Sequence, residues 1–403
     1  MKKTSYTLLA AAVLGTISFW PDTAATAFPA AELAYGQAQQ DTIKTKKSSN
    51  RVHIVTGNDD KGKHSYINIY NGRNESITYK GDVTLTDDFT SIKSISPGGY
   101  LNYSLSVDGD KKELELKSDA QGKLTRRYLV DGKEVAFAPA GEQWLQEMMP
   151  GLIAKTGIGL EARVKDIYQK QGAKGVLAEA GKVEGEHGKL KMVSYLLQQP
   201  NLKPADMTLA LQRAGDYTSS DYELSKLLRN VPASYLGKQE LANAYLSAAG
   251  KVSSDYEKSK VLAHLLDTPN LSKQTTDQAL KVIGTVSSDY EKGKLVQKFI
   301  SNKELLKNSY QGTFGLIGNF SSDYEKSKSI QSILKQHALS AAQFQELLPV
   351  VRNISSDYEK SKVLRAMAPK LPGDATALRQ DYEKVAKTIS SDYEYRKAME
   401  ALD

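Results

Sequence analysis

One phrase, Ser-Ser-Asp-Tyr-Glu-Lys-Ser-Lys, recurs through the C-terminal part of the chain and constrains the fold more than any other feature. It stands complete at Ser253–Lys260, and near-copies begin at Ser219, Ser287, Ser321, Ser355 and Ser390. The aspartates of successive copies are 34, 34, 34, 34 and 35 residues apart. A worn copy lies about one period upstream, at Val183–Lys191. Self-similarity at a fixed period of this length predicts a stacked-repeat protein.

Each copy carries the features of a helix start. In the complete copy, Ser254 can accept a hydrogen bond from a first-turn N–H that has no helical partner. Glu257, three residues on, can reach back to the N–H of the cap residue and complete a capping box. Asp255 and Glu257 also place negative charge at the positive end of the helix dipole. The predicted cap residues are Ser220, Ser254, Ser288, Ser322, Ser356 and Ser391.

The residues after the phrase predict a pair of helices in each unit. We interpret Tyr256, Val261, Leu262, Leu265 and Leu266 as one apolar stripe at helical spacing. The segment Asp267-Thr268-Pro269-Asn270 then breaks the helix, and a second helix is expected from near Ser272 to Gly284. A single hairpin of this size cannot bury both apolar faces, whereas stacked hairpins can. We therefore predict an α-solenoid of about seven helical hairpins. The Trp-x2-Leu-Gly-x2-Tyr pattern of tetratricopeptide repeats is missing, so that assignment is not made.

Residues 51–137 have a different pattern, with alternating apolar and polar residues. The alternation is clear in Ile77–Leu85 and in Leu101–Val107. Turn-forming pairs separate the alternating runs, namely Asn71-Gly72, Asp108-Gly109 and Asp131-Gly132. The pattern predicts an antiparallel β domain of about six to eight strands with one polar face and a modest core of its own. Together with the repeats this gives an α+β fold class.

The chain divides into five predicted parts. Residues 1–27 resemble a secretory signal peptide, with Lys2 and Lys3 before an apolar run and Ala25-Thr26-Ala27 as a cleavage site. An uncleaved N-terminal anchor remains the alternative. Residues 28–50 are polar and lack periodicity, which is typical of a flexible linker. After the β domain, residues 138–182 are expected to form capping helices, and residues 183–403 form the repeat solenoid. Nothing after the signal is apolar for long enough to span a bilayer.

The repeat resembles one found in exported bacterial proteins of uncharacterised activity, and related repeats occur in the extracytoplasmic parts of some antibiotic-sensor metallopeptidases. The resemblance runs from about Ser96 to the end of the chain. It includes the motifs Ser96-Pro97-Gly98-Gly99-Tyr100, Tyr128-Leu129-Val130-Asp131-Gly132-Lys133 and Thr156-Gly157-Ile158. It implies HEAT-like helical hairpins and a periplasmic or secreted location. The chain has no His-Glu-x-x-His motif, so a peptidase role is not carried over.

Composition narrows the chemistry further. The 54 Lys and Arg residues against 47 Asp and Glu give a formal charge of +7, and the two signs alternate within each repeat. A nucleic-acid partner is therefore not expected. The five histidines, His53, His64, His187, His264 and His337, have no metal-ligand spacing, and there is no Gly-x-Ser-x-Gly motif or cysteine. We predict no catalytic, cofactor-binding or metal-binding residues.

The tyrosines of the repeated phrase have two interpretations. Tyr222, Tyr256, Tyr290, Tyr324, Tyr358 and Tyr393 could line up into a ladder that grips a peptide or glycan. Alternatively, they wedge between neighbouring units while serine, aspartate and glutamate cap helices. We favour the wedge, because capping explains three of the five polar or aromatic positions without a ligand.

The sequence thus favours an exported, non-enzymatic scaffold or adaptor that presents an extended solenoid surface to a protein or peptide partner in the cell envelope. A sensory or regulatory module that binds a wall fragment or a membrane sensor is the alternative, and it rests on the resemblance. A hydrolase with a carboxylate site in the β domain or at its junction with the helices is less favoured, since the usual nucleophile and metal patterns are missing.

Overall fold

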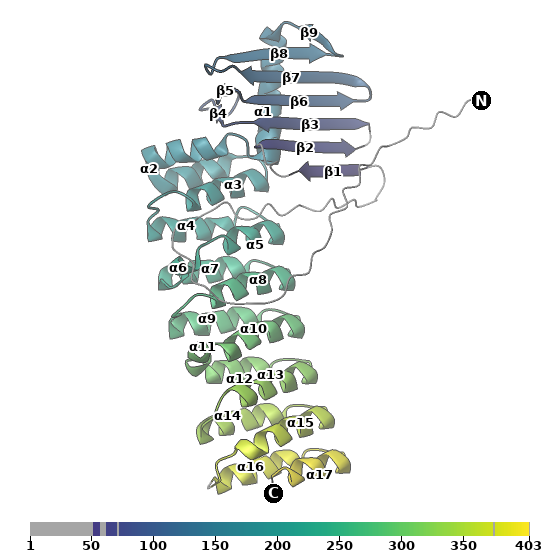
Figure 1. Cartoon of the computed structure of the whole chain (residues 1–403), viewed down its shortest axis with the longest axis vertical. Helices are drawn as coiled ribbons and strands as arrows, with labels where there is room; N and C mark the ends of the chain where they lie inside the picture. Colours follow the sequence, from purple (N-terminus) through teal and green to yellow (C-terminus); the bar gives the residue numbers. More distant parts are fainter. Residues whose placement is uncertain (1–50, 57–61, 71, 374, 403) are drawn as a thin grey trace, which may run out of the picture. The chain divides into compact units, whose positions relative to one another are not determined.

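The protein combines an antiparallel β-sheet with a following series of helical repeats, which confirms the predicted α+β fold class (Figure 1). The computed structural model describes residues 51–56, 62–70, 72–373 and 375–402. The predicted signal peptide and linker lie outside the described residues. The described residues belong to one compact unit, and one continuous apolar core runs from the sheet into the helices.

Seven strands form the main sheet, in the order β1-β2-β3-β6-β7-β8-β9, and every neighbouring pair is antiparallel. They are β1 (Arg51–Thr56), β2 (Lys63–Tyr70), β3 (Arg73–Lys80), β6 (Tyr100–Val107), β7 (Asp110–Ser118), β8 (Leu124–Val130) and β9 (Lys133–Val135). The turns at Asp108-Gly109 and Asp131-Gly132 join their strands as predicted. All four turn residues have positive φ, as two-residue hairpins of this type require.

One predicted strand is in fact two. The alternation from Ile77 to Leu85 suggested a single strand, but β3 ends at Lys80 and Gly81 turns the chain with φ +89°. Val83 and Leu85 then lie in β4 (Val83–Leu85), which pairs with β5 (Ile92–Ile95) in a separate two-stranded ribbon. The sequence periodicity does not reveal this break, because the residues before and after Gly81 follow the same alternation of apolar and polar side chains.

Helix α1 (Glu142–Thr156) covers the buried face of the sheet, and Figure 1 shows it crossing the strands. The ring of Trp144 lies 5.3 Å from that of Tyr103 and 5.5 Å from that of Tyr128. Buried Glu75 on β3 accepts a hydrogen bond from the Tyr103 hydroxyl at 2.8 Å and pairs with Lys155 of α1 at 2.6 Å. An ion pair shielded from water in this way ties the sheet to the first helix.

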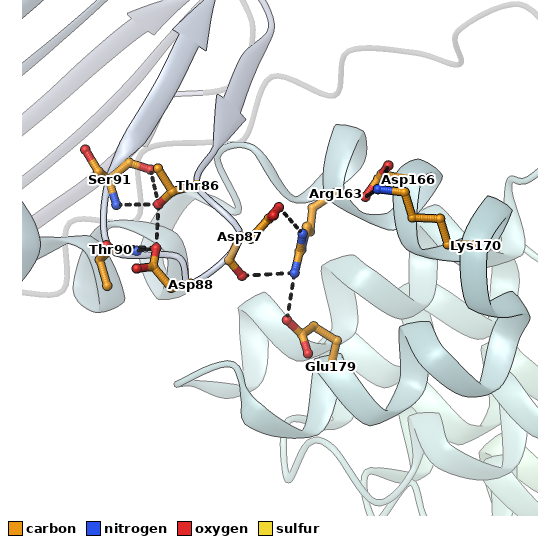
Figure 2. A network of polar contacts seen from close by, with 9 residues as sticks. All are labelled: Thr86, Asp87, Asp88, Thr90, Ser91, Arg163, Asp166, Lys170 and Glu179. Atoms are coloured by element: carbon orange, nitrogen blue, oxygen red, sulfur yellow. Dashed lines mark hydrogen bonds and ion pairs between the residues drawn. The ribbon is translucent and has the colours of Figure 1, made fainter.

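A second contact joins the β4–β5 loop to α2 (Leu160–Lys182), as Figure 2 shows. The Arg163 guanidinium donates to the carboxylate of Asp87 at 2.9 Å, to its carbonyl at 3.0 Å, and to Glu179 at 3.2 Å. Within the loop, Asp88 accepts from the hydroxyls of Thr86 and Thr90. The first helical hairpin is therefore fixed to the β region by charge-assisted bonds.

The repeats form two rows of helices, and the phrase opens each helix of the first row. The first row contains α3 (Glu186–Leu197), α5 (Asp221–Arg229), α8 (Asp255–Leu266), α10 (Asp289–Ser301), α13 (Asp323–Gln336), α15 (Asp357–Met367) and α17 (Asp392–Glu400). The second row contains α4 (Pro204–Ala214), α7 (Gln239–Gly250), α9 (Lys273–Gly284), α12 (Tyr310–Gly318), α14 (Ala341–Arg352) and α16 (Thr376–Ala386). Short helices α6 (Ala233–Leu236) and α11 (Lys303–Lys307) precede α7 and α12.

Each helix packs on the next helix of its own row, α8 on α10 and α7 on α9 for example, and Figure 1 shows the two members of each hairpin side by side. The faces that meet are apolar. In α8 the buried side chains include Val261, Leu262, Leu265 and Leu266, as the sequence predicted. Neighbouring repeats thus supply one another's core, which is the arrangement expected of a solenoid.

Candidate functional site

In five of the six phrases the aspartate binds the next repeat. The carboxylate of Asp255 accepts hydrogen bonds from the backbone N–H groups of Ser287 at 3.0 Å and Ser288 at 2.7 Å. The same pair of bonds, 2.6–3.1 Å long, recurs from Asp221 to Ser253 and Ser254, Asp289 to Ser321 and Ser322, Asp323 to Ser355 and Ser356, and Asp357 to Ser390 and Ser391. Bonds to a carboxylate are stronger than neutral ones, so this residue holds consecutive units together.

This contact corrects the predicted capping box. Ser288 is the N-cap of α10, and its hydroxyl accepts from the N–H of Glu291 at 3.3 Å. Its own N–H, however, donates to Asp255 of the preceding unit and not to the Glu291 side chain. Serine caps of the same geometry, 3.3–3.4 Å long, occur at Ser220, Ser254, Ser322, Ser356 and Ser391.

The worn copy of the phrase makes the same contact with the next repeat, but through a glutamate in place of the aspartate. Glu186 accepts from the N–H of Ser219 at 3.0 Å, from the Ser219 hydroxyl at 2.8 Å and from the Thr218 hydroxyl at 2.7 Å. The hydroxyls of Thr218 and Ser219 hold the pKa of this carboxyl below its usual value. α3 therefore joins the first row in the same way as the later units.

The first lysine of the phrase is buried and braces the same inter-repeat loop. Lys258 donates to the Thr285 hydroxyl at 3.3 Å, and Thr285 is the C-cap of α9. A cation at this place interacts favourably with the C-terminal end of the helix dipole. Lys258 thus binds the start of the loop between two units, and Asp255 binds its end at Ser287 and Ser288. Both contacts come from α8. Lys360 makes the corresponding bond to the Thr388 hydroxyl at 2.9 Å.

The tyrosines of the phrase do not wedge between units, so the structural interpretation favoured from the sequence is wrong. Their side chains are 48% exposed at Tyr222, 54% at Tyr256, 55% at Tyr324 and Tyr358, and 60% at Tyr290 and Tyr393. The helical geometry explains the exposure. Tyr256 precedes Leu265 by nine residues, which at about 100° per residue places the two side chains on opposite faces of α8.

A lysine accompanies each of these tyrosines, four residues later and thus on the same helix face. The lysines are Lys226, Lys260, Lys294, Lys328, Lys362 and Lys397. In α8, α10, α13, α15 and α17 the Nζ atom lies 3.9–5.7 Å from the ring centroid of its tyrosine. We call these twelve residues the Tyr–Lys stripe. The sequence analysis missed its lysines, although the spacing of four residues would have paired them with the tyrosines.

The outermost charge of the stripe is positive. In α8, α10, α13 and α15 the glutamate of the phrase lies beneath the lysine, for example Glu291, whose carboxylate is 3.1 Å from the Lys294 ammonium. In the four complete pairs the glutamate side chains are only 10–12% exposed, whereas the lysines are 33–50% exposed. The carboxylates are thus withdrawn under the surface, and each ammonium, which has three donors, keeps donor capacity toward solvent.

A groove of about 540 Å³ lies beside the stripe, between the end of α8 and the middle of α10. Lys294 of the stripe lines it, together with Lys298, Gln297 and Asn302. Thr268, also in the lining, is 2% exposed, and its hydroxyl has no hydrogen-bond partner within the described part of the chain. Asp267 also lines the groove and pairs with Lys298, so the groove is polar and carries both signs of charge.

The junction with the β region contains the other notable cavity, of about 400 Å³, with Asp87, Asp88, Glu179 and Glu184 in its lining. Hydrogen bonds from Thr86 and Thr90 lower the pKa of Asp88 to about 2, the opposite of what a general acid needs, and Glu179 is paired with Arg163.

The histidines have structural contacts where the structure describes them. The ring nitrogens of His264 and His337 bond to the carbonyls of Val231 at 2.7 Å and Ile300 at 2.6 Å, each in the preceding unit. Among the described residues no cluster of three or more potential metal ligands is found. Within the same residues, no helix has the length and apolarity needed to cross a bilayer.

Comparisons with known proteins add little to this geometry. No family model and no curated protein matches the sequence. Among solved structures, a chain described under "Computational Design of Self-Assembling Cyclic Protein Homooligomers" is 13% identical. The match covers 60% of this chain and 81% of that one with a TM-score of 0.14. A likeness at that level carries no argument about fold or function.

Proposed function

We propose that the protein is an exported, non-enzymatic scaffold or adaptor whose Tyr–Lys stripe binds a protein or peptide partner in the cell envelope. The observation that carries the proposal is that one tyrosine and one lysine recur in all six phrases, although every one of these tyrosines is exposed and every one of these lysines is exposed or half-buried. Their repetition therefore does not follow from burial in the core.

The remaining positions of the phrase have structural roles. The second serine caps its own helix, the aspartate binds the next unit, and the first lysine braces the connecting loop. The seventh position also contacts the next unit, since the Ser259 hydroxyl donates to Glu291 at 2.5 Å. In α8, α10, α13 and α15 the second lysine contacts the tyrosine and the glutamate of its own helix. Removing the tyrosine and this lysine would leave the contacts between repeats in place.

Other parts of the repeats have diverged in sequence, so a recent duplication alone does not explain why the stripe residues recur in every phrase. The second-row helices α7, α9 and α12 read QELANAYLSAAG, KQTTDQALKVIG and YQGTFGLIG, with little in common beyond apolar positions. The stripe has stayed the same while these helices changed. Exposed aromatic residues flanked by charge are the side chains that dominate binding energy at protein interfaces.

Export is part of the proposal and rests on the N-terminal pattern of Lys2 and Lys3 before an apolar run, and on the resemblance to exported repeat proteins. Fusion of a reporter that is active only outside the cytoplasm would test it. Activity of the fusion is expected, and a fusion active only when the first 27 residues are replaced by a known signal would contradict export.

Site-specific photo-cross-linking tests the binding role. A photoreactive phenylalanine analogue would replace Tyr256, Tyr290 or Tyr324 in separate proteins, and exposed Lys281 on α9 would serve as the control position. Irradiation in the envelope fraction is expected to give an adduct of the same mass from all three stripe positions and not from the control. Equal labelling from Lys281, or no adduct from the stripe, would overturn the proposal.

A further inference from the structure

We infer that the Tyr–Lys stripe takes an extended acidic peptide whose carboxylates recur at every third residue. The inference rests on the proposed function, since it names the chemistry of the partner that the same surface would bind. It follows from two properties of the stripe: the donors offered at each step and the distance between steps.

The donors suit a carboxylate better than a sugar ring. In α8 the Lys260 ammonium lies 3.9 Å from the ring centroid of Tyr256, and in α17 Lys397 lies 4.0 Å from that of Tyr393. In these two helices the ring face next to the ammonium group is not available to stack on a sugar, whereas in α10, α13 and α15 the ammonium lies 5.4–5.7 Å from the ring centroid. The pair instead presents a phenolic O–H and ammonium N–H groups side by side, and a carboxylate can accept from both at once.

The charges around each pair favour an anion over a cation. The aspartate of the phrase is engaged by two N–H groups of the next unit, as Asp289 is by Ser321 and Ser322. The glutamate lies under its lysine, and its side chain is about one-tenth exposed. A partner approaching the face therefore meets the ammonium groups first, and an acidic segment is complementary to them.

The spacing selects the conformation of the peptide. One Tyr–Lys pair lies on each first-row helix from α5 to α17, and neighbouring helices pack with axes about 8–10 Å apart. A polyproline II helix rises about 3.1 Å per residue with three residues per turn, so every third side chain returns to the same face after about 9.3 Å. A β-strand returns to the same face after about 6.6 Å. A polyproline II segment with Asp or Glu at every third position thus places one carboxylate on each pair.

The experiment measures binding of labelled peptides by fluorescence anisotropy to the full chain. The test peptide is (Pro-Pro-Glu)5, and a peptide of the same composition with its glutamates clustered at one end is the control. The spaced peptide is expected to bind about tenfold more tightly than the clustered one, and to weaken as salt is raised. Equal affinities, or tighter binding of (Pro-Pro-Lys)5, would overturn the inference.

Two matched triple variants locate the binding. Lys260→Gln, Lys294→Gln and Lys328→Gln together remove three stripe charges and should weaken the spaced peptide about tenfold, because exposed ion pairs of this number amount to about one decade in Kd. The control variant combines Lys273→Gln, Lys281→Gln and Lys384→Gln on second-row helices, with the same change in net charge. An equal loss in the control would show that net charge alone attracts the peptide and would overturn the inference.

Two other polyanions are compared with the spaced peptide as alternative ligands. A helical peptide with glutamate at every seventh residue and an anionic polysaccharide of matched charge are titrated in parallel, and tighter binding of either would overturn the inference. The results that would refute this inference differ from those that would refute the proposed function. If stripe positions give adducts in the envelope while the spaced peptide shows no preference, the inference is wrong and the binding role stands.

Discussion

Replacing Asp289 with alanine should weaken the joint between two repeats more than any exposed charge change. The Asp289 carboxylate accepts from the N–H groups of Ser321 and Ser322, both at 2.6 Å, and pairs with Lys292 at 2.7 Å. The side chains of Asp289 and Lys292 are only 12% and 9% exposed. Their partners are therefore poorly placed to recover bonds to water when the carboxylate is removed.

The cost follows from what Asp289→Ala leaves behind. Two backbone donors lose a charged acceptor, and a largely buried ammonium loses its counter-ion. Hydrogen bonds to charged groups contribute about 1.5–3 kcal/mol, and removing one partner of a buried ion pair costs about 3–5 kcal/mol. These contributions overlap, so we expect a loss of about 3–5 kcal/mol in the free energy of unfolding. Hydrogen exchange should rise first in α10 and α13, which share the joint.

Asp392 provides the matched control. It occupies the same position of the same phrase in α17, but it is exposed. Asp392→Ala should therefore cost no more than about 1 kcal/mol. Urea unfolding monitored by far-ultraviolet circular dichroism, combined with hydrogen exchange by mass spectrometry, measures both variants. A loss for Asp289→Ala no larger than that for Asp392→Ala would refute the assignment of the aspartate as the inter-repeat contact.

Three further predictions concern single residues. Ser288→Ala should lower the free energy of unfolding by about 0.5–2 kcal/mol through loss of an N-cap, whereas Tyr290→Ala, at a ring that is 60% exposed, should cost less than about 1 kcal/mol, both by urea unfolding. Burial raises the pKa of Asp289, but the opposing bonds from Lys292 and the two backbone N–H groups leave it below its usual value. A carboxyl group whose pKa is lowered in the folded state stabilises the fold at pH values above its unfolded pKa of about 3.9. This stabilisation is lost as the pH falls through the folded pKa. The melting temperature should therefore fall as the pH drops below about 4, and it should fall less steeply in Asp289→Asn. Glu75→Gln should cost about 1–3 kcal/mol, because the charge partner of Lys155 is lost from a residue that is 2% exposed, and thermal melts would detect it.

The local structure of the repeats was predictable, because it depends on neighbours along the chain. The serine caps, the apolar face of α8 and the hairpin turns at Asp108-Gly109 and Asp131-Gly132 all follow from residues within one or two turns of one another. The role of Asp255 was not predictable in this way. Its partners Ser287 and Ser288 lie 32 and 33 residues away, and only the stacking of two units brings them within reach.

The exposure of the tyrosines was available from the sequence but misinterpreted. Tyr256 was grouped with Val261 and Leu262 because tyrosine is partly apolar, although its angular position on the helix separates it from them by more than 90°. The angular positions of Tyr256 and Lys260 around the helix axis predict that both side chains lie on the solvent face. The break at Gly81 is a different case, since β4 pairs with β5 and packs on α2, and local alternation does not report these contacts.

We propose that the residues of the phrase have two separate roles: aspartate, serine and the first lysine hold the units together, and tyrosine and the second lysine contact a partner. The most direct test is a variant with Tyr256, Tyr290, Tyr324 and Tyr358 all changed to serine. Its melting temperature and its affinity for the spaced acidic peptide would be measured on the same sample. We predict a melting temperature close to that of the unmodified protein and a binding affinity reduced about tenfold or more. A large fall in melting temperature with unchanged affinity would contradict the account.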